Sequence, residues 1–356
     1  MGNGIAVELT AARKPKPSQQ ALGFGRYFTD HMFMMDYEAD RGWHQPRIVP
    51  YQPIVLDPAA KVFHYGQTVF EGMKAFRAKD GRIRLFRPDA HLRRMNRSNA
   101  RICVPPIDEE TVLTALKQLI AVDREWVPEN EGTSLYIRPF IIATEPLLGV
   151  APSRQYRLTI ILTPVGAYYG EGIRPVRIHV EPDDVRAVAG GVGEAKTAGN
   201  YAAGLQAQEE AARQGYDQVM WLDGVHRQYI EEVGSMNVFF RLGETVVTPA
   251  LSGSILAGVT RDSAIRLLRL WDIPVEERNV SIDELVEAHR AGALREAFGT
   301  GTAAVISPIG ELQWRGERFA IGNGDPGPLA RRLYDAVTGI QRGGEPDPFG
   351  WMADLD

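Results

Sequence analysis

The chain has 356 residues, of which 44% are hydrophobic and 24% are charged, so it has a globular composition and a length that predicts two domains. A net charge of −5 without a long basic run argues against nucleic acid as a partner, and the single cysteine, Cys103, excludes an intramolecular disulfide and a cysteine-rich metal site. The longest apolar runs are too short to span a membrane, and residues 1–20 lack the apolar core of a signal peptide, so we expect a cytoplasmic protein.

The first half of the chain predicts an N-terminal arm over residues 1–20 and a small domain over residues 21–168. Asp80-Gly81 lies between two short apolar runs and favours a hairpin turn. Pro88 is a good first residue for a helix, and we expect Cys103 to be a small buried side chain near the end of that helix. The elements predicted after the hairpin are helices over 88–102 and 109–126 and strands over 135–143 and 157–165.

The second half predicts an interdomain linker over residues 169–175 and a larger domain over residues 176–356. Strands and helices are mixed there without regular alternation, which favours an α+β architecture over one doubly wound parallel sheet. The predicted elements are a strand over 176–180, a helix over 202–214, several strands between 218 and 248, helices over 260–271 and 282–289, strands over 296–306 and a last helix over 329–340.

One glycine motif resembles a nucleotide-binding turn. Gly299-Thr300-Gly301-Thr302-Ala303-Ala304 fits the pattern Gly-x-Gly-x-x-Ala. That pattern binds a dinucleotide only where a helix follows, whereas the residues from Val305 to Gly310 predict a strand and a turn. The motif instead offers backbone N–H groups and two hydroxyls to an anion.

A lysine between two glycine clusters is the first candidate for chemistry. Lys196 precedes a predicted helix, and taken alone it is more often a solvated lysine at a helix start. A helix N-terminus disfavours a positive charge, however, and so lowers the pKa of an amine placed there. A lowered pKa is what a Schiff-base lysine requires.

Further signals in the second half fit the same chemistry. Glu231 and Glu232 end a predicted strand, where two solvated carboxylates are the more common interpretation and a partner for a protonated pyridine nitrogen is the other. The turn from Ser254 to Asp262 leads into a helix N-terminus, which can bind an anion. A lysine, a carboxylate and two anion-binding turns are together the parts needed to hold pyridoxal phosphate (PLP).

With these motifs the sequence resembles the branched-chain amino acid aminotransferases of the fold-type IV class of PLP enzymes, most closely their longer form. The resemblance runs from Phe24 to about Arg342 and implies an α+β chain. It implies a small N-terminal α/β domain and a larger C-terminal PLP-binding domain that is a mixed, β-barrel-like α+β structure. The ordered motifs that carry it are residues 28–32, 70–75, 136–139, 196–201 and 232–237.

The resemblance implies the cofactor-binding positions one by one. Lys196 matches the lysine that forms the internal aldimine with PLP, Tyr201 matches the tyrosine on the phenolic oxygen, and Glu232 matches the partner of the pyridine nitrogen. Arg94 matches the phosphate-binding arginine, and its neighbour Arg93 is the alternative register. The other implied cofactor residues are Ser235, Val259, Thr260 and Thr302.

The resemblance also implies a substrate pocket and a partner subunit. Its pocket residues are Phe24, Tyr65, Phe70, Tyr136, Arg138, Tyr168, Thr302 and Ala303, although such aromatic residues are otherwise more often core residues. Leu148 and Val150 match a loop that reaches the neighbouring subunit's site, which implies a homodimer with shared active sites. Ala304 and Ser307 stand where some animal members carry a redox-active cysteine pair, so that regulation is expected to be absent.

The activity implied is transamination between leucine, isoleucine or valine and 2-oxoglutarate, with PLP and without a metal. It should follow ping-pong kinetics. Two related fold-type IV activities are alternatives, a D-amino acid aminotransferase and an aminodeoxychorismate lyase, which share the lysine and glutamate motifs but not the set 70–75 with 136–139. A non-catalytic PLP carrier or dimeric scaffold is the alternative of a different class.

Overall fold

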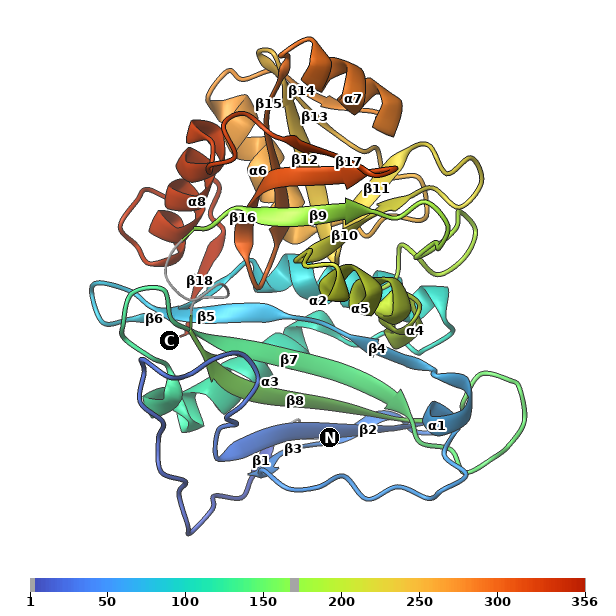
Figure 1. The fold of residues 1–356 in the computed structure, drawn as a ribbon. Helices are drawn as coiled ribbons and strands as arrows, with labels where there is room; N and C mark the ends of the chain where they lie inside the picture. Colours follow the sequence, from blue (N-terminus) through green and yellow to red (C-terminus); the bar gives the residue numbers. More distant parts are fainter. Residues whose placement is uncertain (1–3, 167–172, 356) are drawn as a thin grey trace. The chain divides into compact units, whose positions relative to one another are not determined.

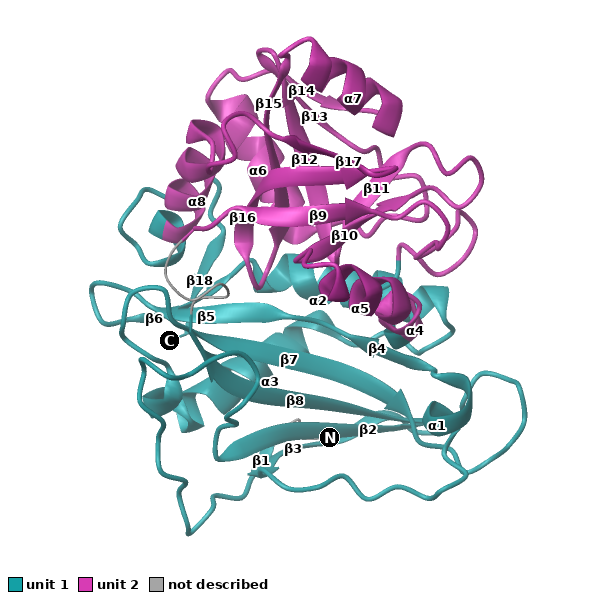
Figure 2. Ribbon diagram, in the orientation of Figure 1, with its two compact units in different colours: residues 1–170, 195–198, 339–356 teal, residues 171–194, 199–338 magenta. Residues whose placement is uncertain are grey.

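The computed structural model describes residues 4–166 and 173–355 and divides the chain into two compact units (Figure 2). The N-terminal unit comprises Met1–Gly170, Ala195–Ala198 and Gly339–Asp356, and the C-terminal unit comprises Glu171–Glu194 and Gly199–Thr338. Most of the linker predicted at 169–175 lies outside the described residues, and the predicted boundaries at 168 and 176 stay predictions. Each unit is built around its own sheet.

The N-terminal unit contains a nine-stranded sheet in which every pairing is antiparallel except that of β1 with β3 (Figure 1). The strand order is β1-β3-β2-β8-β7-β5-β6-β18, with β4 paired to β7. The strands are β1 (Ala6–Val7), β2 (His31–Glu38), β3 (Gly42–Pro50), β4 (Thr68–Phe70), β5 (Met73–Arg77), β6 (Ile83–Phe86), β7 (Ser134–Ala143), β8 (Gln155–Val165) and β18 (Met352–Asp354).

Two long helices cover this sheet and complete its core. α2 (Pro88–Arg101) begins with the predicted proline, and α3 (Glu109–Val122) is capped by Asp108, whose side chain accepts the backbone N–H of Thr111. Their apolar faces join the sheet in one buried cluster. The short helix α1 (Lys61–Tyr65) and the 3-10 turn η1 (Arg124–Trp126) complete the unit.

The C-terminal unit contains a second nine-stranded sheet, in which six strands close into a barrel. The closed order is β11-β10-β9-β16-β15-β12, because β12 pairs with both β15 and β11, and the β10–β9 and β9–β16 pairings are parallel. The strands are β9 (Val176–Val180), β10 (Gln218–Leu222), β11 (Ile230–Val233), β12 (Met236–Leu242), β13 (Thr245–Thr248), β14 (Val275–Glu277), β15 (Leu294–Gly301), β16 (Val305–Trp314) and β17 (Glu317–Ala320).

Five helices flank the barrel or link the units along the chain: α4 (Ala198–Ala202), α5 (Leu205–Arg213), α6 (Val259–Leu270), α7 (Ile282–Arg290) and α8 (Pro328–Gln341). The helix predicted over 202–214 is divided into α4 and α5. Ala203 and Gly204 lie between them, and a Cβ on Gly204 would lie only 2.9 Å from the Trp221 ring. The α+β prediction and the barrel-like C-terminal part are confirmed.

Three features of the N-terminal unit differ from expectation. Sequence analysis missed β2 and β3, because Gln45 has a φ of +53° beside Pro46 and the register shifts at Met34/Asp36, which interrupts the alternating pattern. The arm is tied down, since the Thr10 N–H donates to His31 Nε2 at 2.9 Å and β1 pairs with β3. Cys103 lies just past α2 as predicted, but it is exposed at a φ of +59° rather than buried.

Candidate active site

The segment that carries Lys196 is held against the N-terminal unit by backbone contacts on both sides. The Lys196 N–H donates to Ser98 Oγ of α2 at 2.8 Å, and the Lys196 carbonyl accepts the Phe70 N–H at 3.0 Å. Thr197 forms an isolated antiparallel bridge with Val69, and its hydroxyl donates to the Thr68 carbonyl at 2.7 Å. This short bridge fixes the direction in which the lysine side chain leaves the backbone.

The Lys196 amine lies among aromatic and basic groups. Its side chain is partly buried, and its Nζ stands 4.7 Å from the centre of the Phe70 ring. Burial, and secondly the charge of Arg94, lower the pKa of Lys196 to about 8. A lowered pKa was expected from the following helix, but α4 is only five residues long and the largest cause is burial.

Arg94 belongs to a buried cluster of charged side chains on α2 and the β4–β5 connection. Its Nε donates to Glu71 Oε1 at 2.7 Å and its Nη2 donates to Glu71 Oε2 at 2.9 Å, a bidentate pair. His91 Nδ1 lies 3.0 Å from the same Oε2. Burial alone would raise the pKa of Glu71, but the Arg94 guanidinium outweighs burial and holds that pKa well below its usual range.

Arg93, the alternative to Arg94, is not buried. Arg93 points to the exposed side of α2, where it pairs with Asp89 one turn earlier. Arg94 therefore remains the candidate anion ligand on this helix, and Glu71, which sequence analysis had not singled out, is its carboxylate partner.

Several predicted substrate residues meet on neighbouring strands of the N-terminal sheet. Arg138 Nη2 donates to the Tyr136 hydroxyl at 3.2 Å, and the Arg138 guanidinium lies 4.9 Å from the Phe70 ring centre. The Phe24 ring packs edge-on against Tyr136 at 4.9 Å. Gly72 makes room for this arrangement, because a Cβ there would lie 1.9 Å from the Tyr136 hydroxyl.

The other predicted substrate residues of the N-terminal half are exposed elsewhere or lie outside the described residues. Tyr65 is exposed at the end of α1, where its ring contacts His64, and Tyr168 lies outside the described residues. Leu148 and Val150 lie on the connection between β7 and β8 and are 64% and 87% exposed.

Lys74 is a second lysine that sequence analysis missed. It lies on β5 directly opposite Tyr136 of β7 and is only 8% exposed. Burial lowers the pKa of Lys74 to about 8. The motif 70–75 contained the signal, but a lysine inside a strand does not reveal its burial until the pairing with β7 is known.

The C-terminal unit holds the predicted carboxylate on β11. Glu232 is buried, and its Oε1 accepts the Leu256 N–H at 2.9 Å, while Arg186 Nε lies 3.4 Å from its Oε2. Its neighbour Glu231 accepts the Ser254 hydroxyl. Burial raises the pKa of Glu231, so this carboxyl binds a proton more readily than usual.

The first anion-binding turn leads into α6. Val259 and Thr260 are the first residues of this helix, and its N-cap, Gly258, has no side chain that could bond their N–H groups. A Cβ on Gly258 would lie 2.0 Å from Asn237 Oδ1, so the close approach of the two segments requires glycine.

The second turn is a β-hairpin, which confirms that the glycine–threonine motif is no dinucleotide fingerprint. Thr302 and Ala303 form the turn between β15 and β16, and both are partly buried. Tyr201 lies in α4 and is partly buried, whereas Ser235 is exposed in the turn between β11 and β12.

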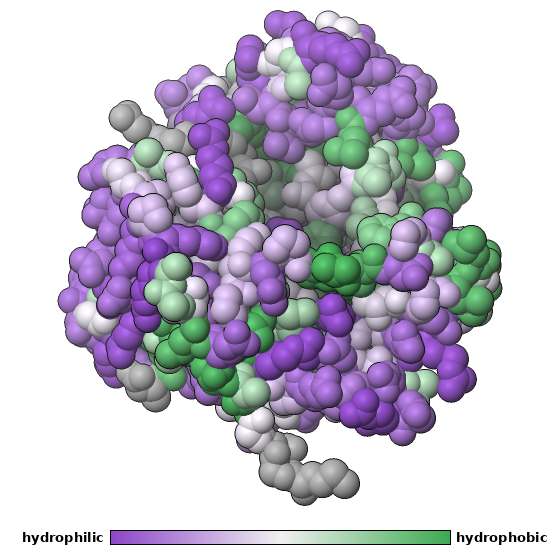
Figure 3. Space-filling view, turned by 90° about the horizontal axis from the view of Figure 1, so that it is seen from below, coloured by the Kyte–Doolittle hydropathy of each residue, from purple (hydrophilic) through white to green (hydrophobic). Residues whose placement is uncertain are grey.

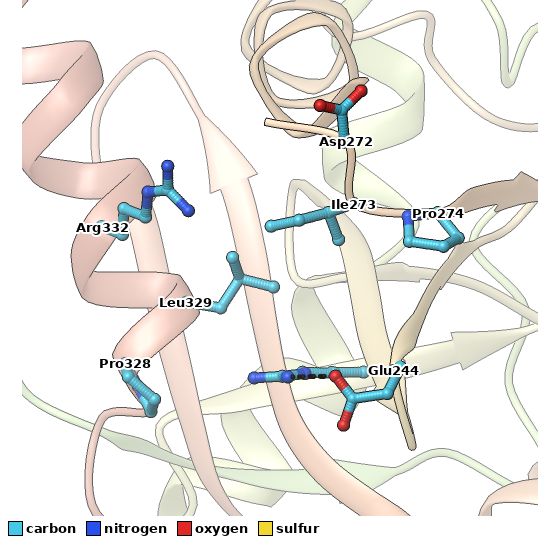
Figure 4. A pocket seen from close by; sticks show the side chains of 8 residues that line it. Glu244, Asp272, Ile273, Pro274, Pro328, Leu329 and Arg332 are labelled. Carbon is cyan, nitrogen blue, oxygen red and sulfur yellow. Dashed lines mark hydrogen bonds and ion pairs between the residues drawn. The ribbon is translucent and has the colours of Figure 1, made fainter. Parts of the chain in front are cut away.

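A separate cavity of about 320 Å³ in the C-terminal unit contains none of these residues (Figure 4). It lies between the start of α8 and the connection that precedes β14. Its lining residues are Arg241, Glu244, Asp272, Ile273, Pro274, Pro328, Leu329 and Arg332. Residues 4–166 and 173–355 contain no group of three or more His, Cys, Asp or Glu side chains that could hold a metal ion.

Comparisons with known proteins identify the family. The model of the amino-transferase class IV family matches residues 68–312. The chain is 60% identical over 351 residues to branched-chain-amino-acid aminotransferase 2 of Bacillus subtilis strain 168, which covers 99% of this chain and 97% of that protein. The chain belongs to the branched-chain amino acid aminotransferases of class IV.

Solved members of the family share the fold. The branched-chain amino acid aminotransferase of Escherichia coli matches with a TM-score of 0.77 at 26% identity, over 92% of this chain and 99% of that one. The T.th. branched-chain amino acid aminotransferase, solved with pyridoxamine 5'-phosphate, matches with a TM-score of 0.77 at 27% identity, over 92% and 98% of the two chains. The same enzyme with N-(5'-phosphopyridoxyl)-L-glutamate gives 0.74 at 26% over the same shares.

The residues of this aminotransferase fit PLP in their chemistry. The Lys196 amine has a lowered pKa, as a Schiff-base lysine requires. Arg94 and the first turn of α6 are groups that can bind phosphate, and the buried Glu232 carboxylate can accept a pyridinium N–H. No helix of the described part of this aminotransferase is long and apolar enough to cross a membrane.

Proposed function

We propose that this aminotransferase uses PLP to move an amino group between leucine, isoleucine or valine and 2-oxoglutarate. The observation that carries the proposal is the Lys196 amine, with its pKa lowered to about 8, over the Phe70 ring and beside Arg94. The 60% identity to a branched-chain-amino-acid aminotransferase supports the choice of substrates.

The cofactor-binding residues have distinct proposed roles. PLP supplies an electron sink for the substrate's Cα carbanion when it is bound. Lys196 holds the cofactor and then moves the proton of the substrate Cα as general base and acid. Glu232 holds a proton at the ring nitrogen. Arg94, Val259, Thr260 and Thr302 bind the phosphate, and Tyr201 and Ser235 complete the cofactor contacts.

The aromatic and basic side chains of the N-terminal unit account for the two kinds of substrate. Phe24, Phe70 and Tyr136 offer apolar walls, which discriminate by only about 1–3 kcal/mol per methylene, so all three branched-chain amino acids should react. Arg138 and the tyrosine hydroxyls, including those of Tyr65 and Tyr168, suit the second carboxylate of 2-oxoglutarate or glutamate. The backbone of Thr302 and Ala303 binds the substrate's first carboxylate.

We propose that the enzyme is a homodimer in which Leu148 and Val150 approach the partner's site. Their exposure supports this, because large apolar side chains on a surface often mark an interaction site. Figure 3 shows a mainly hydrophilic face interrupted by separate hydrophobic patches. Sedimentation should give a dimer, and a monomer with full activity would contradict shared sites. A cytoplasmic location stays a prediction.

Lys196→Ala tests the proposed function. Purified wild-type protein with PLP should be yellow, and borohydride should attach the cofactor to the peptide that contains Lys196. The variant should lose transamination of L-leucine with 2-oxoglutarate. A wild-type protein that gains no colour with PLP, or a variant that keeps its turnover, would refute the assignment.

A substrate panel separates the alternatives. Wild-type protein should form glutamate from L-leucine and 2-oxoglutarate and give little product from D-alanine. The reverse preference would indicate a D-amino acid aminotransferase, and pyruvate release from aminodeoxychorismate would indicate the lyase. Bound cofactor without any turnover would indicate a PLP carrier.

A further inference from the structure

The C-terminal unit presents two adjacent buried carboxylates, Glu231 and Glu232, on strand β11. Successive side chains of a strand point to opposite faces, so the two carboxylates have different surroundings. Glu231 accepts a hydrogen bond from the neutral hydroxyl of Ser254. Glu232 accepts the Leu256 N–H at 2.9 Å and has the Arg186 guanidinium beside it. Burial raises the pKa of Glu231 despite the charge of this guanidinium, whereas Glu232 forms an ion pair with it.

Arg186 is only 8% exposed, and its contacts are unusual for a buried arginine. Its Nη2 donates to the Ser254 carbonyl, which fixes the guanidinium on the loop that precedes α6. Its Nε lies 3.4 Å from Glu232 Oε2 but makes no hydrogen bond within the described residues. The guanidinium therefore supplies a fixed positive charge beside that carboxylate oxygen.

Close packing holds the Arg186 segment against the same loop. A Cβ on Gly193 would lie 2.2 Å from the Ser254 carbonyl oxygen, so this approach requires glycine. From the other side Asn237 Nδ2 donates to the Leu256 carbonyl at 2.8 Å. The loop that leads to the first turn of α6 is thus bound to Arg186, Glu232 and Asn237.

We propose that Arg186 is a positioning residue, which keeps Glu232 ionised and holds this carboxylate in place for the N–H of the cofactor's ring nitrogen. This inference rests on the proposed function. It assigns Arg186 no contact with substrate or cofactor. It also explains why one of two adjacent buried glutamates can serve a cationic ring while the other serves only the loop.

The test compares Arg186→Met, Arg186→Lys and Glu231→Gln in the PLP-loaded enzyme. Arg186→Met should lower kcat for L-leucine about 10–100-fold, the usual range for groups that orient a reactive residue, with KM within about twofold. The absorption spectrum of the bound cofactor should change as well, because the ring nitrogen is held less firmly in its protonated form. Arg186→Lys should keep most of the activity and the wild-type spectrum, and so should Glu231→Gln.

Each contrary result has a definite meaning. A wild-type spectrum and kcat in Arg186→Met would overturn the proposal, as would equal losses in Arg186→Met and Arg186→Lys. A large loss in Glu231→Gln would assign the ring nitrogen to the other glutamate. If Arg186→Met fails to fold, Arg186→Gln, which is polar and uncharged, takes its place and should show the same loss of kcat and the same change of spectrum. Wild-type protein that does not transaminate L-leucine would refute the proposed function instead.

Discussion

Each unit contains a buried arginine–glutamate pair, and the two pairs differ in geometry. In the N-terminal unit Arg94 and Glu71 form two hydrogen bonds of 2.7 and 2.9 Å. In the C-terminal unit Arg186 and Glu232 approach at 3.4 Å, and the Glu232 carboxylate also accepts a backbone N–H. The Arg94 guanidinium binds both oxygens of Glu71, one of which also accepts the Gly72 N–H at 3.1 Å, whereas the Arg186 guanidinium approaches one oxygen of Glu232.

The balance of charge around the two pairs also differs. Around Lys196 the charged neighbours include Arg94, Arg138 and one carboxylate, Glu71, which leaves an excess of positive charge. Around Arg186 there are two carboxylates, Glu231 and Glu232. An excess of positive charge suits phosphate and carboxylate ligands, and a buried ionised carboxylate suits a protonated ring nitrogen. The tight pair, Arg94 and Glu71, therefore positions a cation for anionic ligands. The loose pair, Arg186 and Glu232, provides an anion for the ring nitrogen.

Matched substitutions of the two glutamates should give the largest difference. Removing one partner of a buried pair leaves an uncompensated charge, so Glu71→Gln should lower the free energy of unfolding by about 3–5 kcal/mol. Glu232→Gln should lower it by less, because Arg186 still has Glu231 near it. Urea unfolding of the cofactor-free chains measures both. Asp89→Asn, at an exposed pair on the same helix, is the control and should cost at most about 1 kcal/mol.

Equal losses for Glu71→Gln and Glu232→Gln would abolish the distinction between the two pairs.

The stability of the chain in acid should depend on Glu71. The pKa of Glu71 is lowered in the folded state, so its contribution is present above the ordinary glutamate pKa of about 4.3 and is lost as the pH falls below it. Glu71→Gln should therefore flatten the acid limb of the stability profile.

The effect on kcat should have the opposite order to the effect on stability, with the larger loss at Glu232. Glu232→Gln keeps the shape of the side chain but removes the charge opposite the ring nitrogen, so kcat for L-leucine should fall about 10²–10³-fold. KM should change little, because Glu232 has no proposed contact with substrate. Stopped-flow and steady-state assays measure the two values. If kcat stays within about tenfold of wild type, the loose pair does not provide the anion.

The sequence located the elements of both pairs better than it located their partners. Helix α2 was predicted within one residue at its end, because Pro88 begins it and its apolar face repeats with helical spacing. Arg94 and Glu232 were implied by motifs, whereas Glu71 and Arg186 were not singled out. Their pairing depends on contacts between segments far apart in sequence, which local patterns do not contain.

The lowered pKa of Lys196 shows the same limit. Its place before a short helix was visible in the sequence, and so was the chemical need for a lowered pKa. The cause was not visible, because burial and the charge of Arg94 come from the fold of the N-terminal unit. Lys74 was overlooked for the same reason, since its burial follows from the pairing of β5 with β7.

The smallest expected effect concerns the cost of keeping Lys196 beside Arg94. Its pKa is lowered from 10.5 to about 8, so below pH 8 the folded chain holds an ammonium that the unfolded chain holds more easily. Lys196→Met should remove this cost and stabilise the cofactor-free chain at pH 7 by about 1–2 kcal/mol, less than the full shift would give because the side chain is only partly buried.

The pH dependence of this gain in stability distinguishes it from a simple gain in packing. Between pH 8 and 10.5 the unfolded wild-type chain binds more protons than the folded chain, so wild-type stability rises with pH and the advantage of Lys196→Met should shrink. Urea unfolding at about pH 7, 9 and 10.5 measures the trend, with Lys117→Met on α3 as an unrelated lysine control. An advantage that does not change with pH would show that Arg94 and burial place no cost on the Lys196 charge. In that case the excess of positive charge in the N-terminal unit would be compensated within the folded chain, and the contrast with the C-terminal pair would rest on hydrogen-bond geometry alone.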